Sequence, residues 1–208
     1  MLISKEYISP LAKDLLTNNP LARVATEEVY DSIRSIVSEG KDVFILNNAA
    51  KNCNGVVPIK ENCYIRLEDN YLWFREKPLT YLHSEQKKGG PIDVYKEFTQ
   101  DAERLRVGLE FETGNISSAH RSINKLKVGL MRDELDLAIV IMPVKHLSFY
   151  LTDRVSNYEE LAPYFILLED TPFIVMGFDA EEYSKEAAVL AKGKDGMSNR
   201  STRLWNKK

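Results

Sequence analysis

Hydrophobic and polar positions alternate most clearly between residues 105 and 113, where we expect a β-strand. The apolar residues at 107, 109 and 111 are separated by Gly108, Glu110 and Glu112, the period-two pattern of a half-buried strand. Glu110 and Glu112 should therefore share a face, with Cα atoms about 6.5–7 Å apart. Two carboxylates this close repel each other unless a cation lies between them, and a divalent metal is the usual partner. A short Glu-x-Glu motif also arises by chance, so the pair alone is weak evidence for a metal site.

Other segments complete a predicted order of helices and strands. Apolar runs predict strands at 43–46, 93–97, 135–142 and 172–177, and the run at 135–142 is continuous enough to be buried on both faces. Helical spacing predicts helices from Ser9-Pro10 to about 17, over 21–36 with Gly40 just beyond the end, over 58–74, from Ser117 or Ser118 to about 132, over 145–150 and over 158–165. Helices interleaved with strands predict an α/β fold with a central mixed β-sheet flanked by helices.

Length, charge and cysteine content narrow the class of protein. The 208 residues suit one domain, 1–208, with a single core. No apolar run approaches 18 residues and the N-terminus is not typical of a secretory signal, so we expect a cytoplasmic protein without a membrane span. Cys53 and Cys63 are expected to be reduced thiols. The net charge of −3 argues against a surface coated with basic groups for nucleic acid, although a local basic cleft remains compatible with it.

The last part of the chain is basic. Residues 185–208 contain seven Lys or Arg residues against two acids, with two glycines between them. Such a segment is equally typical of a solubilising tail and of a basic C-terminal arm that contacts a polyanion.

Two further acidic positions could join the Glu110–Glu112 pair. Glu76 stands just before Lys77-Pro78, where the sequence alone favours a solvated residue at a helix end. Asp93 follows a Gly-Gly-Pro turn and opens the predicted strand at 93–97, so it is either a turn residue or a carboxylate at the edge of the sheet. Asp101 competes with it, but lies in a polar run typical of a turn.

The helix expected after the Glu110–Glu112 strand carries one-sided basic charge. Its basic residues are His120, Arg121, Lys125, Lys127 and Arg132. An ordinary amphipathic helix with a solvated basic face explains this pattern as well as the functional alternative does. In that alternative, the helix N-terminus and Arg121 face a phosphate or a base edge.

An aspartate at a strand start followed by an acid-x-charged pair resembles the pattern of the PD-(D/E)xK nuclease superfold. Here it is Pro91-Ile92-Asp93 and then Glu110-Phe111-Glu112. Phosphodiester hydrolysis needs an activated water and neutralisation of charge at the phosphate, and carboxylates that hold Mg²⁺ serve both needs. Glu112 departs from the superfold, which usually has lysine at this position.

Longer stretches make the resemblance specific. The chain resembles the type II restriction endonuclease family of BamHI and its isoschizomers, among which OkrAI is one candidate for this chain. The matching stretches follow in the same order at residues 51–61, 75–79, 89–98, 110–121, 150–155 and 195–198. This family carries glutamate where the superfold has lysine. The first 45 residues match less well. Around Met131, Arg132 and Ile166 the family is more charged, in a region of subunit contact.

The resemblance implies roles for the acidic residues. Asp93, Glu110 and the carbonyl of Phe111 match metal ligands, and Glu76 matches a fourth acidic member, which replaces the solvated interpretation of that residue. Glu112 matches the general base that takes a proton from the attacking water, and Lys60 is placed near a phosphate or the active site. The implied cofactor is Mg²⁺, with Mn²⁺ able to substitute.

The resemblance also implies a DNA partner and residues that read it. The positions that match major-groove readers are Asn115, Ser117, Arg121, Asp153 and Arg154. Arginine suits guanine, aspartate suits cytosine and asparagine suits adenine. Gly193 and Asp195 match a segment that reaches the minor groove. The implied activity is cleavage of double-stranded DNA at GGATCC after the first G, leaving 5′ overhangs and 5′-phosphates, by a homodimer whose bacterial host carries a cognate DNA methyltransferase.

Two other functions compete with this interpretation. A non-cleaving, sequence-specific DNA-binding protein could use the same fold, but it would be free to lose the acidic set at 76, 93, 110 and 112. A two-carboxylate glycosidase would place its carboxyls around a sugar cleft. The polar and basic groups after Glu112 suit a phosphate better.

Overall fold

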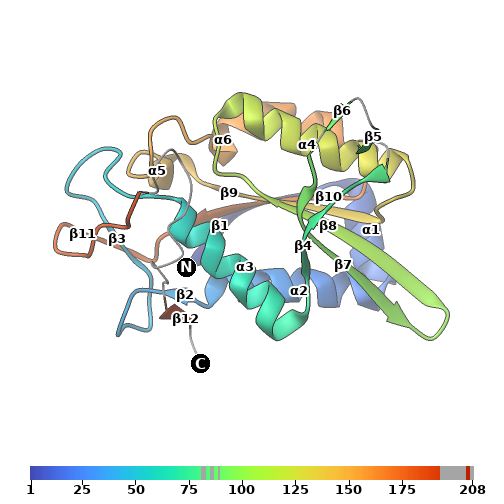
Figure 1. Cartoon of the computed structure of the whole chain (residues 1–208), viewed down its shortest axis with the longest axis horizontal. Helices are drawn as coiled ribbons and strands as arrows, with labels where there is room; N and C mark the ends of the chain where they lie inside the picture. Colours follow the sequence, from blue (N-terminus) through green and yellow to red (C-terminus); the bar gives the residue numbers. More distant parts are fainter. Residues whose placement is uncertain (81–82, 85–86, 89, 193–204, 207–208) are drawn as a thin grey trace.

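Six strands form a mixed sheet through the middle of the molecule (Figure 1). The structure is a computed structural model that describes residues 1–80, 83–84, 87–88, 90–192 and 205–206. The strand order is β1 (Leu2–Ile8), β10 (Phe173–Asp179), β9 (Leu137–Pro143), β8 (Glu103–Phe111), β7 (Ile92–Gln100) and β4 (Phe74–Lys77). β8, β9 and β10 are parallel, whereas β1, β7 and β4 pair with their neighbours in the antiparallel direction. The predicted α/β fold with a central mixed sheet is confirmed.

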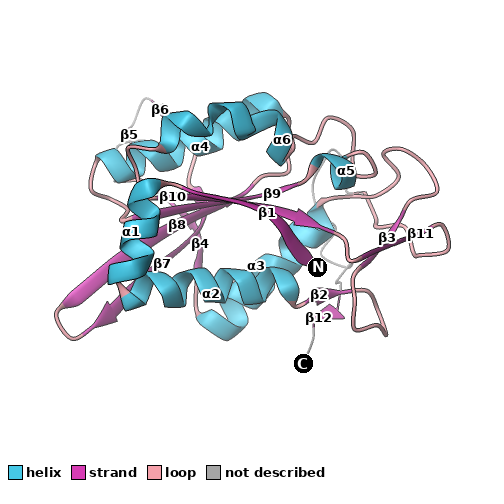
Figure 2. Cartoon of the chain, turned by 180° about the vertical axis from the view of Figure 1, so that it is seen from behind, coloured by secondary structure: helices cyan, strands magenta, loops and turns pink. Residues whose placement is uncertain are grey.

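Helices cover both faces of the sheet (Figure 2). α2 (Pro20–Arg34) and α3 (Val57–Tyr71) pack on one face; α4 (Ile116–Met131), α6 (Tyr158–Leu161) and the 3₁₀ helix η2 (Ala162–Leu168) pack on the other. Alternate residues of β9 contribute to the two cores, with Ile139 on the α2–α3 side and Val140 on the α4 side. β9 is buried over its whole length, which explains its continuous apolar sequence.

Short elements complete the chain around the sheet. α1 (Pro10–Asn18) begins as predicted, because the hydroxyl of Ser9 accepts a hydrogen bond from the backbone N–H of Ala12. α5 (Lys145–Ser148) follows β9. β3 (Ile45–Asn47) pairs with β11 (Glu182–Ser184), β2 (Ile36–Val37) with β12 (Trp205–Asn206), and β5 (His83–Ser84) with β6 (Lys87–Lys88). The β3–β11 pair brings the chain after residue 184 beside the loop 47–55.

The sequence predictions misplaced several element boundaries and missed one strand. The predicted helix over 21–36 ends at Arg34, because residues 36–37 form strand β2, and Gly40 lies in a turn. The helix predicted over 58–74 ends at Tyr71, since Leu72 adopts a left-handed conformation (φ 59°). Residue 74 then starts β4. Strand β1 was not predicted at all, because its middle positions are polar and exposed at the edge of the sheet.

None of the helices in the described part of the chain has an apolar stretch of the length and hydropathy that a bilayer span requires.

Candidate active site

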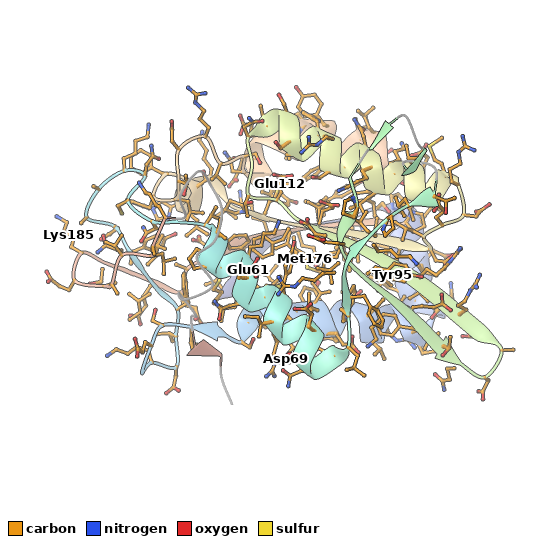
Figure 3. All side chains as sticks on the ribbon, viewed as in Figure 1. Glu61, Asp69, Tyr95, Glu112, Met176 and Lys185 are labelled. Atoms are coloured by element: carbon orange, nitrogen blue, oxygen red, sulfur yellow. The ribbon has the colours of Figure 1, made fainter. Side chains whose placement is uncertain are left out.

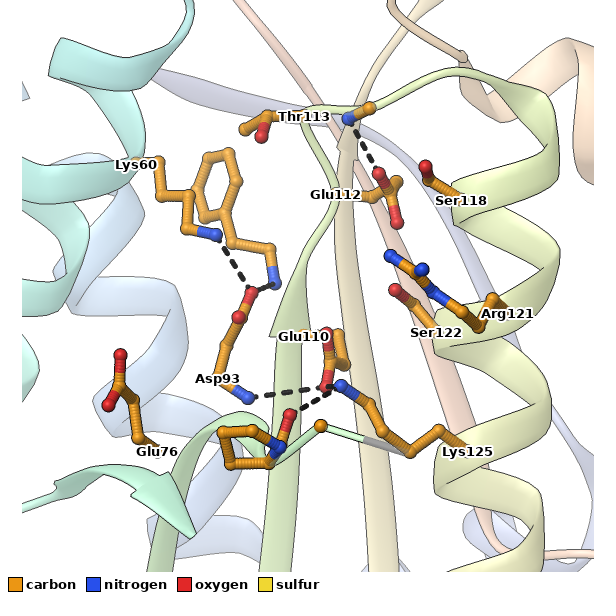
Figure 4. Close-up of a pocket in the computed structure, with 14 residues that line it drawn as sticks. Lys60, Glu76, Asp93, Glu110, Glu112, Thr113, Ser118, Arg121, Ser122 and Lys125 are labelled. Carbon is orange, nitrogen blue, oxygen red and sulfur yellow. Dashed lines mark hydrogen bonds and ion pairs between the residues drawn. The ribbon is translucent and has the colours of Figure 1, made fainter. Parts of the chain in front are cut away.

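An open pocket of about 440 Å³ lies where β7 begins and β8 ends (Figure 4). Helix α3 stands on one side of it and helix α4 on the other, and Glu112 lies between these two helices (Figure 3). The charged residues that line the pocket are Lys60, Glu76, Asp93, Glu110, Glu112, Arg121 and Lys125. The structure therefore brings all four predicted acidic residues to one pocket, together with basic groups from both helical layers.

Asp93 is held by donors from α3 and from the neighbouring strand. Its Oδ2 accepts hydrogen bonds from Lys60 Nζ (3.0 Å), Tyr64 Oη (2.6 Å) and the backbone N–H of Phe111 (3.2 Å). Burial first, and then the charge of Asp93, raise the pKa of Tyr64 well above its usual range, so the phenol stays a donor. The competing candidate Asp101 lies in the turn between β7 and β8, at the other end of β7.

Glu110 is compensated from the opposite side. Its side chain is on the face of the sheet that α4 covers, and the residue is only 3% exposed. Oε1 accepts a hydrogen bond from the Asp93 backbone N–H (3.2 Å) and pairs with Lys125 Nζ at 2.5 Å. Burial and, second, the charge of Asp93 raise the pKa of Glu110 to about 7, against the lowering effect of Lys125. The carboxylate thus lies where additional positive charge would be strongly favoured.

Glu112 lies one residue beyond β8, which ends at Phe111 and not at 113 as predicted. The backbone N–H of Glu112 still donates to the carbonyl of Ile141 (2.8 Å), which fixes the residue against β9. The Oε1 atom accepts a hydrogen bond from the Gly114 N–H (2.6 Å). A Cβ at position 114 would lie 2.7 Å from Ser118 Cβ and 2.9 Å from that same oxygen, so a larger residue there would displace the Glu112 carboxylate or Ser118.

The residue pattern alone suggested that Glu76 lies at a helix end, but it does not. It lies on β4, and the pairs Arg75–Val94 and Lys77–Ile92 on either side set it opposite Asp93. Its backbone is left-handed (φ 56°), an unusual conformation for glutamate, and its side chain is exposed at the pocket. Figure 4 shows it on the α3 side of Asp93.

The donor chemistry of the pocket fits a hard divalent cation. Carboxylates from adjacent strands and a nearby strand-end carbonyl are the oxygen ligands that such ions prefer. Among the residues that the structure describes, no three or more His, Cys, Asp or Glu side chains converge closely enough to enclose an ion. Lys60 and Lys125 instead supply the positive charge at Asp93 and Glu110.

The predicted base-reading residues lie on two neighbouring segments. Asn115 is the N-cap of α4, where its Oδ1 accepts from the Ser118 N–H (3.1 Å), so neither Ser117 nor Ser118 is the cap. Ser117 and Arg121 are exposed on the first turns of α4.

Asp153 and Arg154 are exposed in the loop after α5. The Ser156 N–H donates to the carbonyl of Gly114 (2.9 Å), which joins this loop to the start of α4. Gly193 and Asp195 lie outside the described residues, as does most of the predicted basic arm.

Sequence reasoning did not assign the lysine that pairs with Glu110, or the tyrosine that contacts Asp93. Lys125 was one member of a basic face, and Tyr64 one member of an apolar stripe. Arg121 and Lys125 are four residues apart on one helix, and this spacing indicates that both lie on the same helix face.

Comparison with known proteins identifies the protein family. A family model described as restriction endonuclease BamHI matches residues 1–197. The type II restriction enzyme BamHI of Bacillus amyloliquefaciens is 57% identical over 209 residues, covering 100% of this chain and 98% of that enzyme. The type II restriction enzyme OkrAI of Oceanobacter kriegii is 33% identical over 196 residues, covering 90% and 97%. At that identity the chain is a relative of OkrAI and not OkrAI itself.

The fold has a counterpart among solved structures. The restriction endonuclease BglII, in a crystal structure with a DNA 16-mer, superimposes with a TM-score of 0.62 over 99% of this chain and 98% of that one. The sequence identity is 14%, so this likeness supports the fold alone. Type II restriction endonucleases are site-specific deoxyribonucleases that bind double-stranded DNA and depend on a divalent metal, in agreement with the carboxylate pocket. The family match over residues 1–197 and the full-length identity to BamHI lead to one conclusion: this chain belongs to the BamHI family of type II restriction endonucleases.

Proposed function

We propose that this chain hydrolyses double-stranded DNA at GGATCC in the presence of Mg²⁺, cutting after the first G to leave 5′ overhangs and 5′-phosphates. The observation that carries the proposal is the pocket in which Asp93, Glu110 and Glu112 lie between basic groups from two helices. Arg121 lines the same pocket and also belongs to the predicted base readers. One proposed reader thus lies beside the proposed cutting groups.

The metal site that we propose consists of Asp93, Glu110 and the carbonyl of Phe111, with Glu76 as the fourth acidic member. Mg²⁺ suits hard oxygen donors of this kind, and Mn²⁺ can substitute. A bound ion supplies positive charge beside the scissile phosphate and lowers the pKa of water. Lys60 pairs with Asp93 and Lys125 with Glu110, so each of these two acids on adjacent strands has one basic partner.

We assign the general base to Glu112. Its backbone is tied to β9, and its Oε1 is held by the N–H of Gly114, so the carboxylate has a fixed position at the wall of the pocket. A base must be held within hydrogen-bond reach of the proton that it removes, and such a fixed carboxylate meets that need. Lys60 on the opposite wall is the residue that we place next to the phosphate.

Base reading is assigned to Asn115, Ser117, Arg121, Asp153 and Arg154. The two arginines can donate twice to guanine, and Asp153 can accept from the amino group of cytosine. The N-cap hydrogen bond limits how Asn115 can contact a base. Its Oδ1 already accepts from the Ser118 N–H, so Nδ2 is the atom left to donate to a base. A donor reads an acceptor edge, so Asn115 should contact N7, O6 or O4 of a base.

An exposed apolar surface supports a homodimer. Met131 at the end of α4 is 70% exposed, and Tyr164, Ile166 and Leu167 on η2 are 49%, 68% and 62% exposed. Helix α4 and η2 are neighbours, since His120 packs against Tyr164 at 4.7 Å between ring centroids. Exposed apolar clusters of this kind mark interfaces, and a twofold palindrome requires two reading surfaces. We propose that a second copy of the chain covers this α4–η2 surface.

The remaining assignments follow from the proposed activity. Residues 1–208 form one endonuclease domain, with a basic C-terminal arm from about 185 in which Gly193 and Asp195 approach the minor groove. A bacterium that keeps such an enzyme in its cytoplasm needs a cognate methyltransferase, because its own GGATCC sites would otherwise be cut.

The test of this function is digestion of plasmid DNA in Mg²⁺ followed by sequencing of the fragment ends. Ends at GGATCC, cut after the first G, would support both the chemistry and the assigned readers. Ends at another palindrome would keep the nuclease and overturn the reader assignments. Binding to one site without cutting in Mg²⁺ or Mn²⁺ would overturn the nuclease in favour of a non-cleaving DNA-binding protein.

A further inference from the structure

We propose that Asn54 is a positioning residue for base reading. It fixes the reading loop, residues 152–154, and joins this loop to Leu190 in the first part of the basic C-terminal arm. The inference rests on the proposed function, because it takes Asp153 and Arg154 as readers of the DNA. Asn54 itself would not touch DNA, since the residue is 0% exposed.

The Asn54 side chain connects three segments that are distant in sequence. Its Nδ2 donates to the carbonyl of Asn47 (2.7 Å) and to the carbonyl of Tyr150 (3.1 Å). Its Oδ1 accepts from the backbone N–H of Leu190 (3.2 Å). A buried amide with partners at both ends is costly to remove, because the carbonyl of Asn47 and the N–H of Leu190 would each lose this hydrogen bond, and the bond to Asn47 is buried.

The backbone of Asn54 holds the start of the reading loop. Its N–H donates to the carbonyl of Tyr150 (2.9 Å), and Asn54 forms a parallel β-bridge with Leu151. Thr152 Oγ1 donates to the carbonyl of Asn54 (3.2 Å). The far side of the loop is held by the Ser156 N–H on the carbonyl of Gly114 (2.9 Å). The loop is thus fixed at both ends, and Asn54 fixes one of them.

The readers between these two anchors have few contacts of their own. The side chains of Asp153 and Arg154 are 67% and 84% exposed, and Arg154 has a left-handed backbone (φ 65°). Asn52 adds one direct contact, because its Nδ2 donates to Asp153 Oδ1 at 3.3 Å. Since the loop is short, a shift at the Asn54 anchor should move both readers relative to the bases.

Gly55 shows how closely the C-terminal segment approaches the same point. Its N–H donates to the carbonyl of Leu190 (2.9 Å), and a Cβ at this position would lie 2.1 Å from the carbonyl oxygen of Ala191. Only glycine allows this contact. The first part of the arm therefore passes one residue from Asn54, and displacement of residues 190–191 would remove the Leu190 bond to Asn54.

The experiment measures cleavage of GGATCC and of sites with one base pair changed. Arg154→Ala and Arg121→Ala first identify the base pair that depends on each arginine. Asn54→Ala should then lose about tenfold discrimination at the Arg154 base pair and less than about twofold at the Arg121 base pair. Asn62→Ala is the matched control, because Asn62 is also buried (2% exposed) but donates only within α3, to the carbonyl of Pro58. It should keep discrimination at both pairs.

Two further variants decide the matter if Asn54→Ala does not fold. Asn52→Gly removes the contact to Asp153 while glycine accepts the positive φ of 55° at this position. Gly55→Ala displaces residues 190–191. Both should weaken discrimination at the Arg154 base pair, by about threefold, roughly half the free energy of a tenfold loss.

The inference would be overturned if Asn54→Ala matched Asn62→Ala, or if it lost discrimination equally at both base pairs. It would also be overturned if the folded Asn52→Gly and Gly55→Ala variants kept full discrimination. Failure of the proposed function looks different, because an enzyme that does not cut, or an Arg154→Ala variant with full specificity, would remove the reading role itself.

Discussion

The residues proposed to cut DNA and those proposed to read it are held in different ways. Glu110 and Glu112 are 3% and 5% exposed and are fixed by the strand ladder of β8 and β9. Asp153 and Arg154 are exposed in a short loop whose position depends on its two anchors. Chemistry at a phosphate requires fixed charge in a partly dry pocket, whereas a base edge must be reached from outside.

The two regions also differ in how their charges are balanced. Glu110 pairs with Lys125 at 2.5 Å in a buried setting. Arg154 Nε lies 3.7 Å from Asp153 Oδ2 in solvent, where such a pair is weak. The exposed pair can therefore exchange its internal contact for contacts to bases, while the buried acids keep their need for positive charge.

Removal of a buried acid should separate cutting from reading most strongly. Glu110→Ala deletes a proposed metal ligand, so the cleavage rate should fall by roughly 10³-fold or more, while binding to GGATCC measured in Ca²⁺ should persist. Glu97→Ala is the matched control, because Glu97 is an exposed acid farther along the neighbouring strand β7. Specific cutting by Glu110→Ala at the wild-type rate would show that Glu110 is not a ligand.

Disruption of the dimer tests two points. Recognition of the palindrome should need two copies of the chain, whereas each carboxylate pocket should be complete within one chain. Ile166→Asp places a charge in the α4–η2 surface of both copies, and loss of two buried isoleucines should weaken the dimer by about 3–6 kcal/mol. Analytical ultracentrifugation should find monomers with normal metal binding but little cutting at GGATCC. Val24→Asp is a control at another exposed apolar residue (48% exposed), on α2. Dimers of undiminished stability in Ile166→Asp would place the interface elsewhere.

Without a divalent metal, the free energy of unfolding should depend on pH through the buried carboxylate of Glu110 in the cutting region, and the exposed residues of the reading loop should add little to this dependence. The pKa of Glu110 is raised to about 7 in the folded chain, so folding favours its protonated form. Its contribution is present below the unfolded pKa of about 4.3 and is lost as pH rises to about 7, a change on the order of 4 kcal/mol.

Urea unfolding across this pH range, in EDTA, measures the effect. Glu110→Gln should lack this part of the decline, and a divalent metal should restore stability to the wild type at pH 8. An identical pH dependence in the wild type and Glu110→Gln would contradict the assignment of the decline to Glu110.

A change in the reading loop should have the smallest effect on chemistry. Arg154→Ala should lose about 1–3 kcal/mol of discrimination at one base pair, with the maximal rate on the preferred site little changed once the DNA is saturating. Competition cleavage between GGATCC and single-substitution sites measures this directly. Unchanged specificity would remove Arg154 from the readers.

The sequence predicted elements best where local pattern and tertiary burial agreed. The apolar run that became β9 and the alternation around Glu110 could be interpreted because the same residues face the core in the structure. Strand β1 could not, since an edge strand with polar, exposed middle residues has no strong periodicity.

The acids that line the pocket could be proposed from the sequence, but the cations that contact them could not. Asp93, Glu110 and Glu112 were candidates from their places at predicted strands, and the family resemblance gave them roles, whereas Glu76 was misplaced because helical spacing continued by coincidence past Tyr71. The contacts of Lys60 with Asp93 and of Lys125 with Glu110 depend on how α3 and α4 pack on opposite faces of the sheet. That information is tertiary, and no local pattern contains it.

The most direct test of the division between cutting and reading is the Glu112→Lys variant, assayed on one duplex for both binding and cleavage. The proposed roles predict wild-type-like affinity for GGATCC and a loss of cleavage of about 10²–10⁴-fold, because lysine at this position cannot take the proton from water as the carboxylate does. Cleavage at the wild-type rate would show that Glu112 is not the base. Loss of specific binding together with cleavage would show that the two regions are not separate.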